Sequence, residues 1–252
     1  MKIFYTITFL CLSFIAHAQI PKIDTDRPDQ TESVNIVPKK WLQFEAGFNY
    51  QKNDDISHEF LVPTLLSKYG LSNRIELRLI TTILRQSVDI PSLGKINNTE
   101  LEQVEIGAKV ALFEEKNFLP KTSLLFHVGI PGLASYKTDK FLFNSRLTMQ
   151  HTLSKNISLG YNFGVEFDGT SDDPVFIYTL APGINLGEKW YAYIEAFGDF
   201  QKNGAHSLDG GLAYYISDNF KLDISSGFGI SGNAPKYCVS LGASVRFNTS
   251  KQ

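Results

Sequence analysis

Apolar and polar residues alternate with a period of two along most of this chain. In residues 41–50, every second residue from Leu42 to Tyr50 is apolar, and the residues between them are polar or Gly. The same alternation recurs in residues 103–112, 157–168, 221–230 and 236–247. A period of two places successive side chains on opposite faces of an extended strand. The pattern therefore predicts β-strands that have one apolar and one polar face.

Counting every segment of this kind predicts twelve strands. They lie at roughly residues 41–52, 58–69, 73–85, 101–113, 121–130, 141–153, 157–168, 174–186, 189–201, 205–216, 220–231 and 236–248. The faces of two segments are ambiguous. Pro63 interrupts 58–69, and in 189–201 acidic residues share a face with aromatic ones.

Short connections follow the even-numbered strands, and longer ones follow most of the odd-numbered strands. Residues 70–72 (GLS) and 217–219 (SDN) are short connections, whereas 86–100 and 131–140 are long. Gly, Ser, Asn and Asp are the residues that tight hairpin turns select. An even number of strands with alternating short and long connections is typical of an outer-membrane barrel.

The length of the segments favours a membrane barrel over a soluble β-sandwich. A tilted membrane strand needs about 9–11 residues, which these segments provide, whereas strands of soluble proteins usually have about five or six. A lipocalin barrel has only about eight strands. We therefore expect an all-β fold, a transmembrane antiparallel up-and-down β-barrel of about 12 strands with its apolar faces toward lipid.

Residues 1–18 (MKIFYTITFLCLSFIAHA) have the form of a signal peptide. Lys2 precedes a mostly apolar stretch, and Ala16-His17-Ala18 has the small-x-small pattern that precedes a cleavage site. We expect export through this signal peptide and location in the bacterial outer membrane. Cleavage would leave Cys238 as the remaining cysteine, so we expect no internal disulfide.

Residues 19–40 contain three Pro and show no period. We assign 19–40 to a periplasmic N-terminal extension and 41–252 to the barrel. The extension could be a disordered lead-in. Alternatively, it could tuck back into the barrel mouth, where four charged residues would meet lumen charges: Asp24, Asp26, Arg27 and Asp29.

Composition agrees with a barrel once the alternation is known. The chain has 24 Lys+Arg and 26 Asp+Glu, which excludes a nucleic-acid binder that relies on a basic surface. A mean hydropathy of -0.11 resembles that of a soluble protein, but lipid-facing and lumen-facing residues average out in a barrel. Phe, Trp and Tyr make up 13% of the residues, and many lie near predicted strand ends, where aromatic girdles form.

The polar faces supply candidate lumen residues of both charges. They are Glu45, Arg74, Glu76, Arg78, Glu105, Lys109, Arg146, Glu166, Asp223 and Arg246. These side chains could form ion pairs that fill a narrow interior, or a constriction that selects a solute. Arg74, Glu76 and Arg78 share a face at a spacing of two and are the best local candidates for a charge ladder. The sequence does not separate the two roles.

Catalytic motifs are absent from the sequence. It contains no Gly-x-Ser-x-Gly elbow, no CxxC, no HExxH and no phosphate-binding Gly loop. His206 and Ser207 are adjacent, so in a strand they would point to opposite faces. The His-x-Ser pattern of the outer-membrane phospholipase, also a twelve-stranded barrel, is missing as well. We expect no enzymatic activity, no metal site and no cofactor.

Three motifs resemble a known family. They are TDRPDQTES at 25–33, VPKKWLQFEAGFNY at 37–50 and YGLSNRIELRL at 69–79. In them the chain resembles the Bacteroidetes type of the phenol meta-pathway degradation (MetA-like) outer-membrane family, whose members are often labelled "transporter". With the strand pattern, the resemblance spans most of residues 24–248. It implies an outer-membrane barrel that passes small, including aromatic, molecules.

We therefore predict a porin-like channel or passive transporter for small polar or aromatic solutes. Its expected partners are outer-membrane lipid, small-molecule solutes and the barrel-insertion machinery, with no nucleic acid, and we expect a monomer. The alternative is a structural or surface-interaction barrel with a plugged lumen and no transport. In that case loop 86–100 would be the contact surface.

Overall fold

The computed structural model describes residues 21–90, 94–129, 142–169 and 171–250. The predicted signal peptide lies outside these residues. The strands are β1 (Trp41–Lys52), β2 (Ser57–Gly70), β3 (Ile75–Ile90), β4 (Gly94–Phe113), β5 (Lys121–Gly129), β6 (Leu142–Thr152), β7 (Ile157–Asp168), β8 (Val175–Leu186), β9 (Trp190–Asp199), β10 (His206–Ser217), β11 (Phe220–Gly229) and β12 (Tyr237–Asn248).

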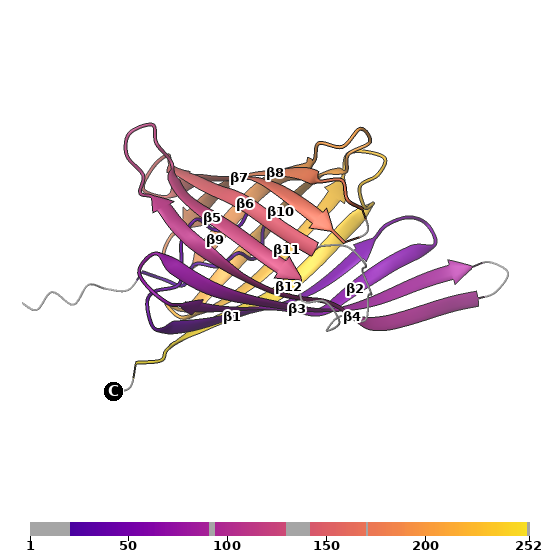
Figure 1. Ribbon diagram of the computed structural model, residues 1–252, viewed down its shortest axis with the longest axis horizontal. Helices are drawn as coiled ribbons and strands as arrows, with labels where there is room; N and C mark the ends of the chain where they lie inside the picture. The colour runs from indigo at the N-terminus through magenta and orange to yellow at the C-terminus, as the bar shows by residue number, and fades with distance from the viewer. Residues whose placement is uncertain (1–20, 91–93, 130–141, 170, 251–252) are drawn as a thin grey trace, which may run out of the picture.

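The twelve strands form one closed barrel in which each strand pairs with its sequence neighbours (Figure 1). The barrel closes between β1 and β12, which are antiparallel from Trp41↔Asn248 to Lys52↔Tyr237. The predicted all-β transmembrane up-and-down barrel is thereby confirmed. In the part of the chain that the structure describes, no helix is long and apolar enough to cross a membrane.

Burial in this barrel is the reverse of that in a soluble protein. Charged and polar side chains are enclosed, among them Glu76 at 0% exposure and Asn162 at 0%. Large apolar side chains lie outside, including Phe163 at 54% and Ile194 at 68%. Soluble monomers rarely expose contiguous apolar surface on this scale, so the outer face is suited to lipid.

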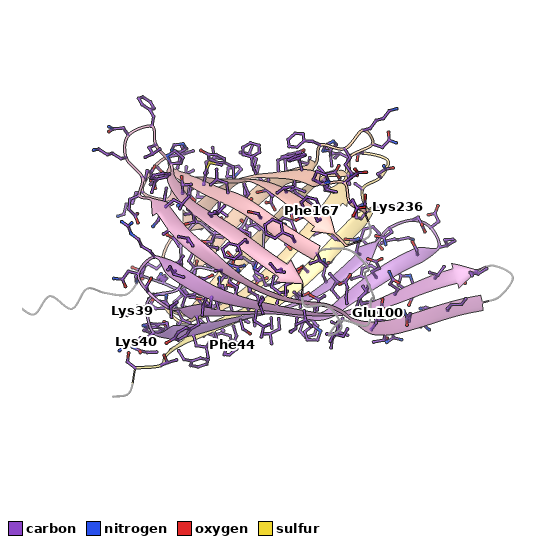
Figure 2. All side chains as sticks on the ribbon, in the orientation of Figure 1. Lys39, Lys40, Phe44, Glu100, Phe167 and Lys236 are labelled. Atoms are coloured by element: carbon purple, nitrogen blue, oxygen red, sulfur yellow. The ribbon has the colours of Figure 1, made fainter. Side chains whose placement is uncertain are left out.

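The two ends of the barrel differ in their connections. One end, which we call the turn end, carries residues 71–74, 114–120, 153–156, 187–189 and 218–219. The opposite end, the loop end, carries the connections that follow β1, β3, β5, β7, β9 and β11. Figure 2 shows Lys39 and Lys40 at the turn end and Lys236 at the loop end.

The expected loop 86–100 is wrong. β3 continues to Ile90 and β4 begins at Gly94, so a paired hairpin projects beyond the barrel at the loop end (Figure 1). Gly94, the first residue of β4, has a φ of 81°, a backbone conformation that Gly adopts without steric cost. Most residues of this hairpin lie beyond the part of the barrel whose outer face is apolar. Their sequence does not alternate between apolar and polar residues, so the pattern did not predict the hairpin.

Pro63 marks an irregularity inside β2 rather than an end of the strand. The register of β2 shifts between Leu61 and Thr64, relative to β3. Proline has no N–H to donate to a neighbouring strand, so bulges are a usual place for it. The shift changes which residues of β2 face the lumen, which explains the ambiguity of this segment in the sequence.

Candidate functional site

Residues 21–40, which we call the N-terminal segment, lie inside the barrel. Ile23, Val34 and Val37 are at most 3% exposed. Both ends of the segment lie at the turn end, where Ile23 N donates to Asp218 O and Lys40 N donates to Gly70 O. Of the two arrangements considered for 19–40, the described part has the one that enters the barrel.

Asp26 lies where three strands of the wall present cations. Its Oδ2 is 2.8 Å from Lys68 Nζ and 2.9 Å from Arg78 Nη1, and its Oδ1 is 3.0 Å from Lys109 Nζ. Burial alone would raise the pKa of Asp26, but the attraction of Lys109, Lys68 and Arg78 holds it well below its ordinary value of 3.8. The carboxylate is therefore ionised at neutral pH.

Wall carboxylates complete this ion-pair network. Glu45 accepts a hydrogen bond from Asp26 N at 2.9 Å and pairs with Lys68. Glu76 accepts one from Val37 N at 2.7 Å and pairs with Arg78 at 3.0 Å. The segment is thus held through its backbone as well as through the Asp26 side chain.

Arg27 lies at the seam where the barrel closes. It pairs with Asp223 on β11 at 3.0 Å and donates to Ser240 on β12 at 2.7 Å. Gly47 and Gly242 face each other across β1 and β12. A Cβ at either position would lie 2.1 or 2.3 Å from an Arg27 side-chain atom. These two glycines make the space that the guanidinium fills.

The segment also contacts the wall across the lumen from β2 and β3. Thr31 Oγ1 lies 2.6 Å from Thr179 Oγ1 on β8 and also donates to Glu195 on β9. Glu32 N donates to Asn162 Oδ1 on β7 at 2.7 Å. Contacts on opposite sides mean that the segment spans the middle of the barrel.

Most of the candidate lumen residues point inward and are at most 6% exposed. They are Glu45, Glu76, Arg78, Glu105, Lys109, Asp223 and Arg246. Arg146 and Glu166 pair with each other at 2.8 Å and are half-buried.

Arg74 does not join the predicted charge ladder. It lies in the turn before β3 and is exposed. The alternation of a strand does not extend into a turn, and this is the physical reason for the correction. Only Glu76 and Arg78 of the three therefore face the lumen together.

Sequence reasoning did not single out Lys68, Glu195 or Lys221 as candidates. Lys68 and Glu195 lie in the two segments with ambiguous faces. Lys221 belongs to a clear polar face, so phase alone could have suggested it, and it donates to Thr25 Oγ1 and Arg27 O. Their role depends on the N-terminal segment, which has no period.

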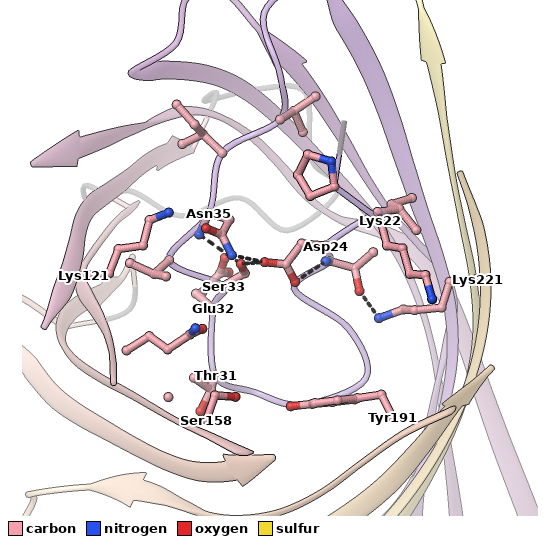
Figure 3. A pocket seen from close by; sticks show the side chains of 18 of the residues that line it. Lys22, Asp24, Thr31, Glu32, Ser33, Asn35, Lys121, Ser158, Tyr191 and Lys221 are labelled. Carbon is pink, nitrogen blue, oxygen red and sulfur yellow. Dashed lines mark hydrogen bonds between the residues drawn. The ribbon is translucent and has the colours of Figure 1, made fainter. Parts of the chain in front are cut away.

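Two cavities lie within the barrel. The larger, of about 850 Å³, opens at the turn end and is lined by Lys22, Lys68, Tyr191 and Tyr215 among others. Figure 3 shows the segment running through it, with Ser33 and Asn35 donating to Asp24.

The smaller cavity, of about 340 Å³, lies toward the loop end. Its lining includes Glu100, Glu105, Phe143 and Phe167. No described residue lines both cavities. Residues of the segment line the turn-side cavity, and none of its described residues lines the loop-side one. Among the described residues, no group of His, Cys, Asp or Glu is arranged to hold a metal ion.

Solved structures with the same fold are outer-membrane proteins. An outer membrane channel from Pseudomonas putida F1 matches with a TM-score of 0.65 at 12% identity, over 85% of this chain and 98% of that chain. A KdgM porin matches with a TM-score of 0.56 at 12% identity, over 81% of this chain and 99% of that chain. At this identity the likeness shows the fold. A comparison with curated proteins gives no match.

A family model described as "Putative MetA-pathway of phenol degradation" matches residues 25–247. The match begins within the N-terminal segment, at the first residue of the TDRPDQTES motif, and ends in β12. It therefore covers the lumen-filling segment and the barrel together. The chain is an outer-membrane β-barrel that belongs to this family, as its three motifs indicate.

Proposed function

We propose that this barrel passes small polar or aromatic solutes across the outer membrane, and that the N-terminal segment rearranges during passage. The observation that carries the proposal is the pair of cavities inside one closed barrel, about 340 Å³ on the loop side and about 850 Å³ on the turn side. A purely structural barrel has no need of such spaces at both ends of its lumen.

The chemistry of the cavity walls supports solutes that combine a ring with a polar group. Tyr191 and Tyr215 line the larger cavity, with carboxylates and amides beside their rings. The smaller cavity is lined by carboxylates and amides that include Glu105, Asn144 and Glu166. The family description refers to phenol degradation, which agrees with such solutes. The two solved structures with the same fold are a channel and a porin, which agrees with passage through the barrel.

The alternative function is a structural or surface-interaction barrel in which the segment never leaves. The ion pairs around Asp26 and Arg27 favour it, because they bind the segment firmly across the lumen. The two functions differ in one measurable respect. Transport requires the segment to move, and the alternative requires it to stay.

A disulfide between the N-terminal segment and the barrel wall distinguishes the transport function from the structural one. Thr31 and Thr179 are suitable positions because their hydroxyl oxygens are 2.6 Å apart. In a Cys238→Ser background, Thr31→Cys with Thr179→Cys would lock the segment when oxidised. We expect solute flux into liposomes to be lost on oxidation and restored by reduction, and Thr179→Cys alone to be insensitive. Absence of flux in the reduced protein would favour the plugged barrel.

We further propose that residues 1–18 are a cleaved signal peptide, that the barrel-insertion machinery assembles the chain, and that it is a monomer. The charged n-region, apolar stretch and small-x-small site support the first point. Mass spectrometry of the mature protein would test it, with an N-terminus at Gln19 as the expected result. Catalysis is not part of this proposal.

A further inference from the structure

Three cationic side chains of the barrel wall converge on a single carboxylate. Lys68 on β2, Arg78 on β3 and Lys109 on β4 have side chains at most 2% exposed. Together they bind both oxygens of Asp26 at 2.8 to 3.0 Å. We call these three residues the cation triad.

The wall supplies only part of the negative charge that the triad requires. Glu45 pairs with Lys68, and Glu76 pairs with Arg78. Three cations therefore pair with two wall carboxylates. The balance comes from two carboxylates of the N-terminal segment, Asp26 and Glu32, because Glu32 Oε2 lies 2.9 Å from Arg78 Nη2.

Lys109 shows this dependence most clearly. Its ammonium donates to Asp26 Oδ1 at 3.0 Å and to Ser33 O at 2.7 Å, and Glu32 Oε2 lies 3.7 Å away. All three groups belong to the segment. A buried charge that loses its partner is strongly destabilised, so the segment cannot leave without a substitute for its carboxylates.

Wall residues also hold the Arg78 side chain of the triad in place. Arg78 Nε donates to His127 Nε2 at 2.9 Å, and His127 Nδ1 lies 4.0 Å from Glu105 Oε2. His127 and Glu105 belong to the wall, on β5 and β4. The guanidinium thus keeps its orientation independently of the segment, as a preorganised binding group should.

The larger cavity gives a route to the triad. Six Lys and Arg residues, Lys68 among them, line this cavity together with six Asp and Glu residues, so its lining is balanced in charge. The smaller cavity, in contrast, is lined by four glutamates and by no Lys or Arg among the described residues. An anion is therefore expected to reach the triad from the turn side.

We propose that the cation triad is a binding site for the carboxylate of a small organic acid, which replaces Asp26 when the segment leaves the lumen. The Asp26 side chain ends in the CH₂–COO⁻ group that a short organic acid also presents. Charge-assisted hydrogen bonds from Lys and Arg recognise either carboxylate equally. An organic acid therefore lowers the free energy of opening. This last consequence rests on the proposed transport function, whereas binding at the triad does not.

Chemical rescue tests the site without relying on transport. In the full-length protein, Asp26→Ala removes the one carboxylate that all three triad cations share, while Glu32 stays beside Arg78 and Lys109. We expect acetate to raise, in a saturable manner, the temperature at which the folded gel band of this variant is lost. Acetamide, and chloride at equal ionic strength, should not do so. If Asp26→Ala does not fold, Asp26→Gly, which leaves room for the whole acetate ion, is used in the same assay.

Asp24→Ala is the matched control, since it is the same change at an exposed carboxylate of the same segment. Acetate should not affect its stability. Equal effects of acetate and chloride on Asp26→Ala, or an equal acetate effect on Asp24→Ala, would overturn the site.

A second experiment tests competition with Asp26 in the unmodified protein. In planar bilayers, benzoate should increase the open probability several-fold, while benzamide, which has the same shape but no charge, should not. Lys109→Gln should remove the benzoate effect. A conducting protein that responds equally to benzoate and benzamide would overturn the competition.

The two experiments distinguish failure of the carboxylate site from failure of the transport function. Acetate rescue in a protein that never conducts would support the carboxylate site and contradict transport. Conduction without acetate rescue would support transport and contradict the site.

Discussion

At the scale of single residues, Asp26 connects the N-terminal segment to the wall most directly. Its carboxylate meets three buried cations, and its backbone N–H donates to Glu45. Removing one partner of a buried ion pair typically costs about 3–5 kcal/mol. The closed arrangement of the lumen should therefore be sensitive to this residue and to the pH at which it titrates.

The pH at which the lumen opens follows from the lowered pKa of Asp26. A carboxyl group whose folded pKa is depressed stabilises the fold fully above its ordinary value and loses this contribution as the pH falls through the folded value. We expect the conductance of the native protein to stay low at pH 4.5 and to rise below pH 3.8.

Asp26→Asn is the comparison for this pH experiment. It should already conduct at pH 7 and lack the acid-induced step, as measured in planar bilayers. Opening of the native protein between pH 5 and pH 7 would mean that another group controls the segment.

A substitution at Gly47 tests whether the Arg27 side chain occupies the space beside this glycine. A Cβ at this position would lie 2.1 Å from Arg27 Nη1, so Gly47→Val should displace the segment without adding charge. We expect higher conductance and faster proteolysis of the segment. Gly232→Val is the control, because nothing lies within 4 Å of a Cβ there. Identical conductance and proteolysis of the two variants would contradict the placement of the Arg27 side chain beside Gly47.

At the scale of elements, each strand of the barrel has one face toward lipid and one toward the lumen. In β7, Asn162 is buried and binds the segment, whereas its neighbour Phe163 is 54% exposed. Lipid acts on every second residue of a strand, so the alternation can be read from the sequence. The hairpin of β3 and β4 beyond the barrel could not be read in this way, since lipid does not impose a pattern there.

Phe163→Arg tests the lipid face. A cation near the bilayer midplane costs about 2–4 kcal/mol in a membrane barrel, so we expect a lower yield of folded protein in lipid vesicles and an earlier unfolding transition in urea. Phe118→Arg is the matched control, since Phe118 lies in the turn 114–120 and is 98% exposed. If Phe163→Arg folds as well as Phe118→Arg, the assignment of the lipid face is wrong.

At the scale of the whole molecule, closure between β1 and β12 removes both sheet edges. A closed barrel satisfies its backbone hydrogen bonds internally, which is necessary in a bilayer and also makes the fold resistant to detergent. The N-terminal segment adds contacts across this closure, because Arg27 binds β11 and β12 while the segment continues directly into β1.

Gel mobility tests the closed barrel. We expect unboiled protein in detergent to migrate differently from boiled protein, since the closed barrel persists in the unboiled sample. Asp26→Ala should lower the temperature at which the two forms become equal. Co-migration of boiled and unboiled native protein, together with a soluble fraction in cells, would contradict the membrane barrel.

Much of the fold was accessible from the sequence, but less of the site. The strand number follows from alternation alone, and so do the approximate bounds outside the β3–β4 hairpin and the two faces of the strands other than β2 and β9. Inward positions such as Glu76 and Lys109 follow from phase in the same way. Partners such as Lys68 and Glu195 were missed because a proline irregularity or a mixed face obscured the phase of their strands.

In the strands with a clear alternation, the sequence by itself determined which residues meet lipid and which meet the lumen, because a strand exposes alternate residues to the two environments through local geometry. Only the tertiary structure decided what fills the lumen. Asp26 and Lys109 are 83 residues apart, and no local pattern relates them. Their pairing arises when the barrel closes around the segment, since cations enclosed away from water require a carboxylate within reach.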